Sequence, residues 1–160
     1  MIQNVKKILA PLDFSEHSMA AMHGAWELAQ ETDADVHIVH VVVPHHSFIP
    51  LMLVSNAEQD RELMRESAME QQAEEELARI KKDEFKNSKK VSTAVLKGAA
   101  VQCLVDYAKK NAIDLILLST HGRTGGETIL IGSVTEKLVR HAPCSVLVFR
   151  RRDRGAPAAS

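Results

Sequence analysis

Short apolar runs alternate along the chain with segments of helical character, and this alternation limits the possible folds more than any other feature. The run at residues 36–43 is dense in valine and ends at Pro44. Such density is typical of a strand that is covered on both faces, as the strands of a parallel sheet are. We therefore expect parallel strands joined by helices.

The rest of the chain repeats this pattern. Strands are predicted at residues 5–12, 36–43, 91–96, 113–119 and 144–149. Helices are predicted from residue 15 to about residue 30 and at residues 57–84, 101–111 and 128–141. Each crossover must be right-handed and packs on one side of the sheet or the other. The predicted fold is therefore α/β, a single-domain five-stranded parallel sheet with helices on both faces, and it is Rossmann-like.

The length of 160 residues fits one domain. We place that domain at residues 1–150 and expect residues 151–160 to form a disordered C-terminal tail. Residues 45–54 include Pro50 and mix polar with apolar side chains, so a loop or lid is predicted there.

Charge and hydropathy disfavour two classes of partner. The formal net charge of -1 removes the broad basic field that supplies most affinity for nucleic acid. No apolar run approaches the roughly 20 residues that span a bilayer, and the first residues lack an apolar leader segment, so a cytoplasmic location is expected. Cys103 and Cys144 have no metal-binding spacing and are read as small core residues.

The fold class predicts where a ligand binds. In open parallel sheets, ligands lie at the carboxyl ends of the strands, where the strand order reverses. The segments to consider are therefore Asp13, residues 41–43 and residues 119–133, because each follows a predicted strand.

The most informative segment is the glycine-containing stretch from Ser119 to Thr135. Glycines let backbone N–H groups approach a phosphate closely, and a helix start adds unpaired donors and a partial positive charge. Ser133 and Thr135 add hydroxyl donors. The segment is neither a Walker A loop nor a GxGxxG turn. The alternative reading is a flexible connection whose glycines serve turns.

Within this stretch, Gly122 is followed after nine residues by Gly132 and Ser133. This spacing resembles the second half of the G-x2-G-x9-G-[S/T] loop of ATP-binding universal stress proteins, and Ser119 stands where the first glycine of that loop falls. The resemblance covers nearly the whole chain. Its matching blocks are residues 7–15, 39–41, 114–116, 132–137 and 142–148.

The resemblance implies an adenine nucleotide alpha hydrolase-like fold that binds ATP or AMP. Asp13 would then lie near the ribose and any Mg²⁺, held through water, and Val41 would line the adenine pocket. The phosphates would lie on Gly132, Ser133, Val134 and Thr135. The remaining residues expected to contact the nucleotide are Pro11, Leu12, Ser119, Thr120, Gly122 and Arg123.

The residues themselves leave the role of Asp13 open. It ends the first predicted strand, so its carboxylate lies where it could accept ribose hydroxyls or coordinate Mg²⁺ through water. It also precedes a helix, where a negative charge stabilises the helix by about 0.3 to 1 kcal/mol. Both roles are compatible with its position.

The expected function is a stress-response binding or regulatory module that holds an adenine nucleotide. The alternatives are a dimeric stress protein that acts through protein partners without nucleotide, and a slow ATP hydrolase. We identify no catalytic residue in the sequence. A homodimer is expected through residues 144–149, an edge strand in members of this family, unless residues 150–160 shield that edge.

Overall fold

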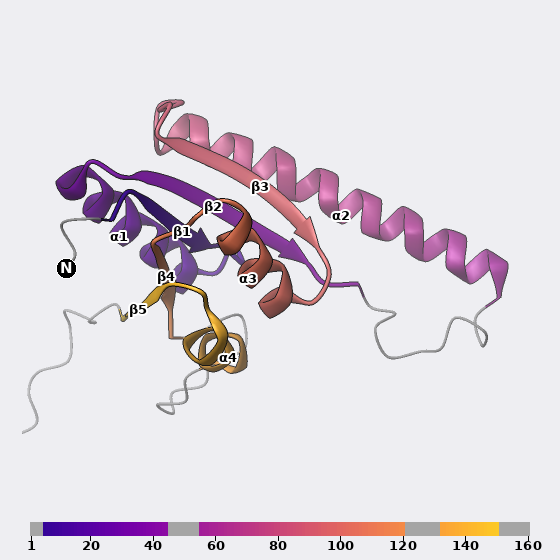
Figure 1. Cartoon of the computed structure of the whole chain (residues 1–160). Helices are drawn as coiled ribbons and strands as arrows, with labels where there is room; N and C mark the ends of the chain where they lie inside the picture. The colour runs from indigo at the N-terminus through magenta and orange to yellow at the C-terminus, as the bar shows by residue number, and fades with distance from the viewer. Residues whose placement is uncertain (1–4, 45–54, 121–131, 151–160) are drawn as a thin grey trace, which may run out of the picture.

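The computed structural model describes residues 5–44, 55–120 and 132–150 (Figure 1). Within these ranges the chain forms strands and helices in strict alternation. The strands are β1 (Lys7–Pro11), β2 (Asp35–Val42), β3 (Val91–Lys97), β4 (Leu115–Ser119) and β5 (Ser145–Phe149). The helices are α1 (Glu16–Thr32), α2 (Asn56–Asp83), α3 (Ala100–Lys110) and α4 (Ser133–His141).

The five strands form one parallel sheet in the order β3-β2-β1-β4-β5. Ile8 of β1 lies opposite Val36 of β2 on one side and Leu115 of β4 on the other. The chain winds outward from β1 through β2 to β3, and then returns to add β4 and β5 on the other side. This confirms the predicted five-stranded parallel sheet and places its switch point between β1 and β4.

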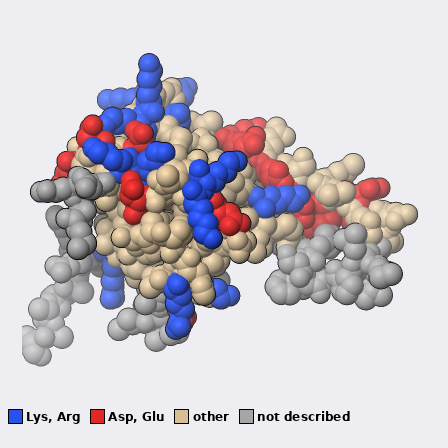
Figure 2. All heavy atoms as spheres, viewed as in Figure 1, with Lys and Arg blue, Asp and Glu red and all other residues tan. Residues whose placement is uncertain are grey.

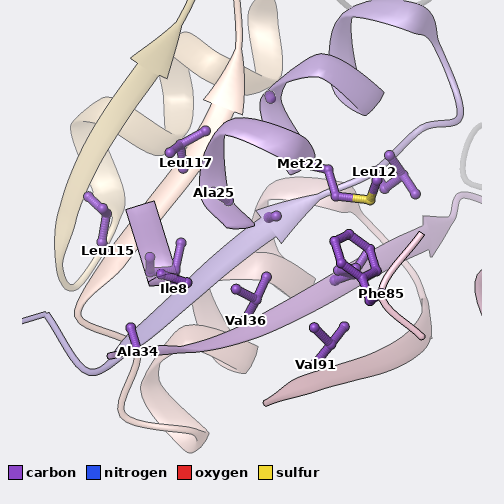
Figure 3. Close-up of a cluster of buried hydrophobic side chains, with 14 of the residues drawn as sticks. Ile8, Leu12, Met22, Ala25, Ala34, Val36, Phe85, Val91, Leu115 and Leu117 are labelled. Carbon is purple, nitrogen blue, oxygen red and sulfur yellow. The ribbon is translucent and has the colours of Figure 1, made fainter. Parts of the chain in front are cut away.

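Successive residues of each strand point to opposite faces, and a separate core covers each face. Ile8 packs in the core beneath α1 and α2, whereas its neighbour Leu9 packs beneath α3 and α4. Figure 3 shows the first of these cores, where Met22 and Ala25 of α1 pack over the strands. Helices cover both faces, as predicted, and the central strands β1 and β4 are almost entirely apolar, as expected for strands buried on both faces.

Helix α2 has an acidic outer surface. Figure 2 shows Asp and Glu side chains gathered along this helix, while acidic and basic side chains are mixed at the other end of the same view. Glu66 is the exception, because it is buried. Its carboxylate pairs with Lys97 at the end of β3 at 2.5 Å, which ties the helix to the sheet.

The ends of the helices depend on local capping. Ser15 caps α1 by accepting a hydrogen bond from the Ser18 N–H at 3.2 Å. Ser55 and Glu58 form a capping box at the start of α2. Gly132 is the N-cap of α4, with an extended ψ of 149°, so α4 begins at Ser133. The predicted continuous helix over residues 128–141 is therefore wrong at Gly132, and residues 128–131 lie outside the described residues.

The turn between β3 and α3 requires glycine. Gly98 has a φ of +140°, which residues with a side chain rarely adopt. A Cβ at this position would lie 2.9 Å from the Cys103 sulfur. Cys103 and Cys144 are free thiols, and burial raises the pKa of both, which favours the neutral thiol.

None of the helices in the described ranges is long and apolar enough to cross a membrane. Three segments lie outside the described residues. They are the predicted loop or lid at residues 45–54, residues 121–131 of the glycine-containing segment, and the predicted tail at residues 151–160.

Candidate functional site

A cavity of about 320 Å³ opens at the carboxyl ends of β1, β2 and β4, beside the switch point of the sheet. Small-molecule sites of proteins begin at about this size. Its wall is formed by Pro11, Leu12, Asp13, Ser18, Val39, His40, Val41, Ala100, Leu104, Leu118, Ser119, Gly132, Ser133, Val134 and Thr135. The strand ends, the β1–α1 turn and the first turns of α3 and α4 therefore meet at one place.

Most of the residues expected from the sequence to bind a ligand line this cavity. They are Pro11, Leu12, Asp13, Val41, Ser119, Gly132, Ser133, Val134 and Thr135. Thr120 does not line it, but its carbonyl oxygen accepts a hydrogen bond from the Gly132 N–H at 3.0 Å. Gly122 and Arg123 lie outside the described residues.

Sequence reasoning missed part of the wall. The missed residues are Ser18, Val39, His40, Ala100, Leu104 and Leu118. Val39 could have been found, because side chains two apart on a strand share a face and Val41 was expected in the site. Leu104 gave no such signal, because its place in the wall depends on how α3 packs against the sheet.

Within the β1–α1 turn, two hydrogen bonds join Asp13 to the start of α1. Its carboxylate Oδ1 accepts from the Ser15 N–H at 3.0 Å, and its own N–H donates to Ser18 Oγ at 3.3 Å. Between them Phe14 has a φ of 64°, a left-handed conformation that costs about 1–3 kcal/mol in a residue with a side chain. This strained turn lets Asp13 line the cavity while Ser15 starts the helix.

The start of α4 forms another part of the wall. Thr135 Oγ1 donates to the Ser119 carbonyl oxygen at 3.1 Å, and the Gly132 N–H donates to Thr120. These two bonds tie the end of β4 to the first turn of α4. Among the described residues no side chain caps this helix, and the partial positive charge of a helix start favours an anion.

The backbone conformation at position 132 does not require glycine, and the lack of a side chain there leaves space in the cavity wall. The φ of −58° at Gly132 suits any residue, and a Cβ would meet Thr120 O at 3.5 Å and Thr135 Oγ1 at 4.0 Å, which are ordinary contacts. Among the described residues, a side chain here would therefore meet no close contact. The missing side chain instead keeps the approach to the helix start open.

The cavity has an apolar and a polar part. Val39, Leu104 and Leu118 belong to the core beneath α3 and α4 and reach the cavity wall. The polar side chains of the wall are those of Asp13, Ser18, His40, Ser119, Ser133 and Thr135. This division suits a ligand that carries an apolar ring at one end and an anionic group at the other.

The described residues offer little to bind a metal by themselves. They contain no group of three or more His, Cys, Asp or Glu side chains that could hold an ion. Asp13 is the one acidic residue of the described cavity wall. A metal here would therefore need most of its ligands from a bound molecule and from water.

Comparison with known proteins gives a consistent picture. The model of the universal stress protein family matches residues 4–150. A universal stress protein of Methanocaldococcus jannaschii, MJ0531, is 36% identical over 146 residues, which cover 91% of this chain and 82% of the relative.

Solved structures share the fold. Universal stress protein UspA from Lactobacillus plantarum is 27% identical, with a TM-score of 0.77 over 91% of this chain and 98% of the other. A universal stress protein in complex with cAMP is 20% identical, with a TM-score of 0.59 over 91% of this chain and 97% of the other, and the likeness extends to the fold alone.

Proposed function

The chain belongs to the universal stress protein family, and from this membership and the cavity we propose that it binds an adenine nucleotide, ATP or AMP, as a stress-response regulatory module. One observation carries the proposal. An apolar wall and the start of α4, with glycine at its N-cap, border the same cavity at the switch point of the sheet.

Each part of a nucleotide has a matching part of the wall. The base would lie against the apolar side chains, among them Val39, Val41 and Leu104. The phosphates would lie at the N-terminus of α4, where Gly132 leaves room and the Ser133 hydroxyl can donate, while Thr135 holds the first turn of the helix to β4. Asp13 would accept hydrogen bonds from the ribose hydroxyls.

The donor set also fits a Mg²⁺ ion that enters with the nucleotide. Mg²⁺ is typically held by one or two carboxylates, by substrate phosphates and by several waters. Asp13 would supply the carboxylate, acting through water, and the ion would neutralise phosphate charge.

Titration calorimetry with ATP and AMP, with and without Mg²⁺, tests the proposal. We expect dissociation constants in the micromolar class, which correspond to about −8 kcal/mol. The absence of heat with every adenine nucleotide at several temperatures would reject it. The protein as purified should also release an adenine nucleotide on acid extraction, identified by its ultraviolet spectrum and mass.

A second proposal concerns assembly, because the far edge of the sheet is apolar. β5 is an edge strand, and its Leu147 is 43% exposed. Val139 on the adjacent α4 is 55% exposed. We propose that β5 pairs with β5 of a second copy, which would cover this edge and these side chains.

The two proposals are separable. A dimer that releases no nucleotide would favour the alternative, a stress protein that acts through protein partners. We also propose a cytoplasmic location, which is consistent with two free thiols and with a reducing compartment.

A further inference from the structure

His40 contacts the residue that precedes Asp13. It lies on β2, and its Nδ1 is 2.7 Å from the carbonyl oxygen of Leu12. A carbonyl oxygen can only accept, so Nδ1 carries the proton and donates. In this tautomer, the neutral ring leaves Nε2 as its acceptor.

The hydrogen bond from His40 pairs the Leu12 carbonyl oxygen, which lies just beyond the last paired residue of β1. β1 ends at Pro11, and the Leu12 N–H still donates to Val39 O of β2 at 2.8 Å. The chain then turns away at Phe14, so the Leu12 carbonyl leaves the ladder. Buried carbonyl groups are nearly always paired, and here a side chain of β2 supplies the donor.

His40 also contacts the residue that follows Asp13. The rings of His40 and Phe14 have centroids 4.6 Å apart and planes inclined at 33°. Phe14 is the residue in the left-handed conformation that makes the turn. One side chain of the neighbouring strand therefore holds the chain on both sides of Asp13, at the edge of the cavity it lines.

We propose that His40 is a positioning residue of the cavity, which fixes Asp13 for its ligand chiefly through the Leu12 hydrogen bond, with the Phe14 contact as a smaller contribution. The expected effect of His40 on ATP affinity rests on the proposed nucleotide binding. This role of His40 acts through Asp13 and requires no contact between the imidazole and the ligand.

Two substitutions separate the two contacts. His40→Phe keeps a ring against Phe14 but removes the donor to Leu12. His40→Asn keeps a donor at the place of Nδ1 but removes the ring. We expect ATP affinity, measured by calorimetry below the melting temperature, to fall about tenfold in His40→Phe and to recover largely in His40→Asn.

His23→Phe is the matched control. His23 lies on α1, is not part of the cavity wall, and pairs with Glu84 at 3.0 Å. ATP affinity should not change in this variant. Wild-type affinity in His40→Phe, or an equal loss in His40→Asn, would overturn the assigned role of the hydrogen bond.

A double-mutant cycle tests whether His40 acts through Asp13. In an Asp13→Ala background, His40→Phe should cause little further loss of ATP affinity, because the positioned carboxylate is already absent. A full tenfold loss in that background would show that His40 acts independently of Asp13 and would overturn the proposal.

Amide hydrogen exchange gives a readout that needs no ligand. The Ser15 N–H donates to Asp13 Oδ1, so its exchange reports where that carboxylate lies. Exchange at Ser15 should be faster in His40→Phe and close to wild type in His40→Asn. If the wild type binds no nucleotide, the proposed function fails, and this exchange pattern alone decides whether His40 positions Asp13.

Discussion

At the scale of single residues, the fold does not require glycine at position 132, whereas a ligand at the start of α4 would. The backbone conformation of Gly132 suits any residue, and a Cβ would meet its protein neighbours at ordinary distances. A side chain at this position would therefore be tolerated by the protein. It would occupy the approach to the start of α4.

We expect Gly132→Val to lower ATP affinity by about tenfold or more. Stability should fall by only about 1 kcal/mol, because glycine is a somewhat better N-cap than valine. Calorimetry and urea unfolding measure the two effects, and Gly132→Ala should lie between valine and wild type. Unchanged affinity in the valine variant would mean that the ligand does not approach the start of α4.

Gly98 shows the opposite requirement, because the fold itself needs this glycine. Gly98→Ala would place a side chain in a disfavoured conformation and against the Cys103 sulfur. We expect the free energy of unfolding in urea to fall by about 1–3 kcal/mol. Adding Cys103→Ala should recover part of the loss, since it removes the close contact but leaves φ unchanged. A Gly98→Ala variant as stable as wild type would contradict this account.

At the scale of elements, β2 and α3 are joined by a polar contact inside their interface. His37 of β2 and Tyr107 of α3 lie 3.0 Å apart, from Nδ1 to the hydroxyl oxygen, with their rings edge to face. Burial, and then the charge of Lys7, lower the pKa of His37, while Asp35 opposes the shift. The folded protein therefore favours neutral His37.

This lowered pKa predicts a pH dependence of stability. The ordinary pKa of histidine is about 6.5, so the unfolded chain takes up the proton at a higher pH than the folded protein does. The contribution of neutral His37 is complete above about pH 6.5 and is lost as the pH falls from there toward the lowered folded pKa.

Urea unfolding at pH 8 and at pH 5.5 measures this effect. The loss of stability between these pH values should be smaller in His37→Gln than in wild type. Tyr107→Phe is the control, and it should keep most of the loss, because burial is the largest cause of the shift. If the pH dependence of stability in His37→Gln equals that of wild type, the loss of stability comes from other titrating groups.

At the scale of the whole molecule, the exposed edge of the sheet predicts the oligomeric state. We expect Leu147→Glu to weaken the proposed dimer strongly, because it would bury a charge beside the two-fold axis. Leu63→Glu on α2 is the matched control, since Leu63 is 60% exposed and lies far along the chain from β5. Sedimentation equilibrium at tens of micromolar should give a dimer for wild type and for the control. A monomeric wild type would reject the dimer.

The sequence by itself was enough to predict the order and type of the elements. Each strand has its own apolar run, as at residues 36–43, and each helix its own spacing or composition, so these features are local. It also indicated Asp13, Val41 and Ser119 for the cavity wall. The carboxyl ends of parallel strands share one edge of a sheet, whatever the details of packing.

Tertiary structure decided what depends on partners distant in the chain. The start of α4 at Ser133 depends on an N-cap at Gly132 that bonds to Thr120, and helical spacing of apolar residues upstream did not indicate it. The contact of His40 with Leu12, beside Asp13, depends on β2 lying next to β1, because the strand order brings together residues 28 positions apart. Hydrogen bonds and contacts of this kind form only after the strands have paired, and for this reason local sequence patterns do not record them.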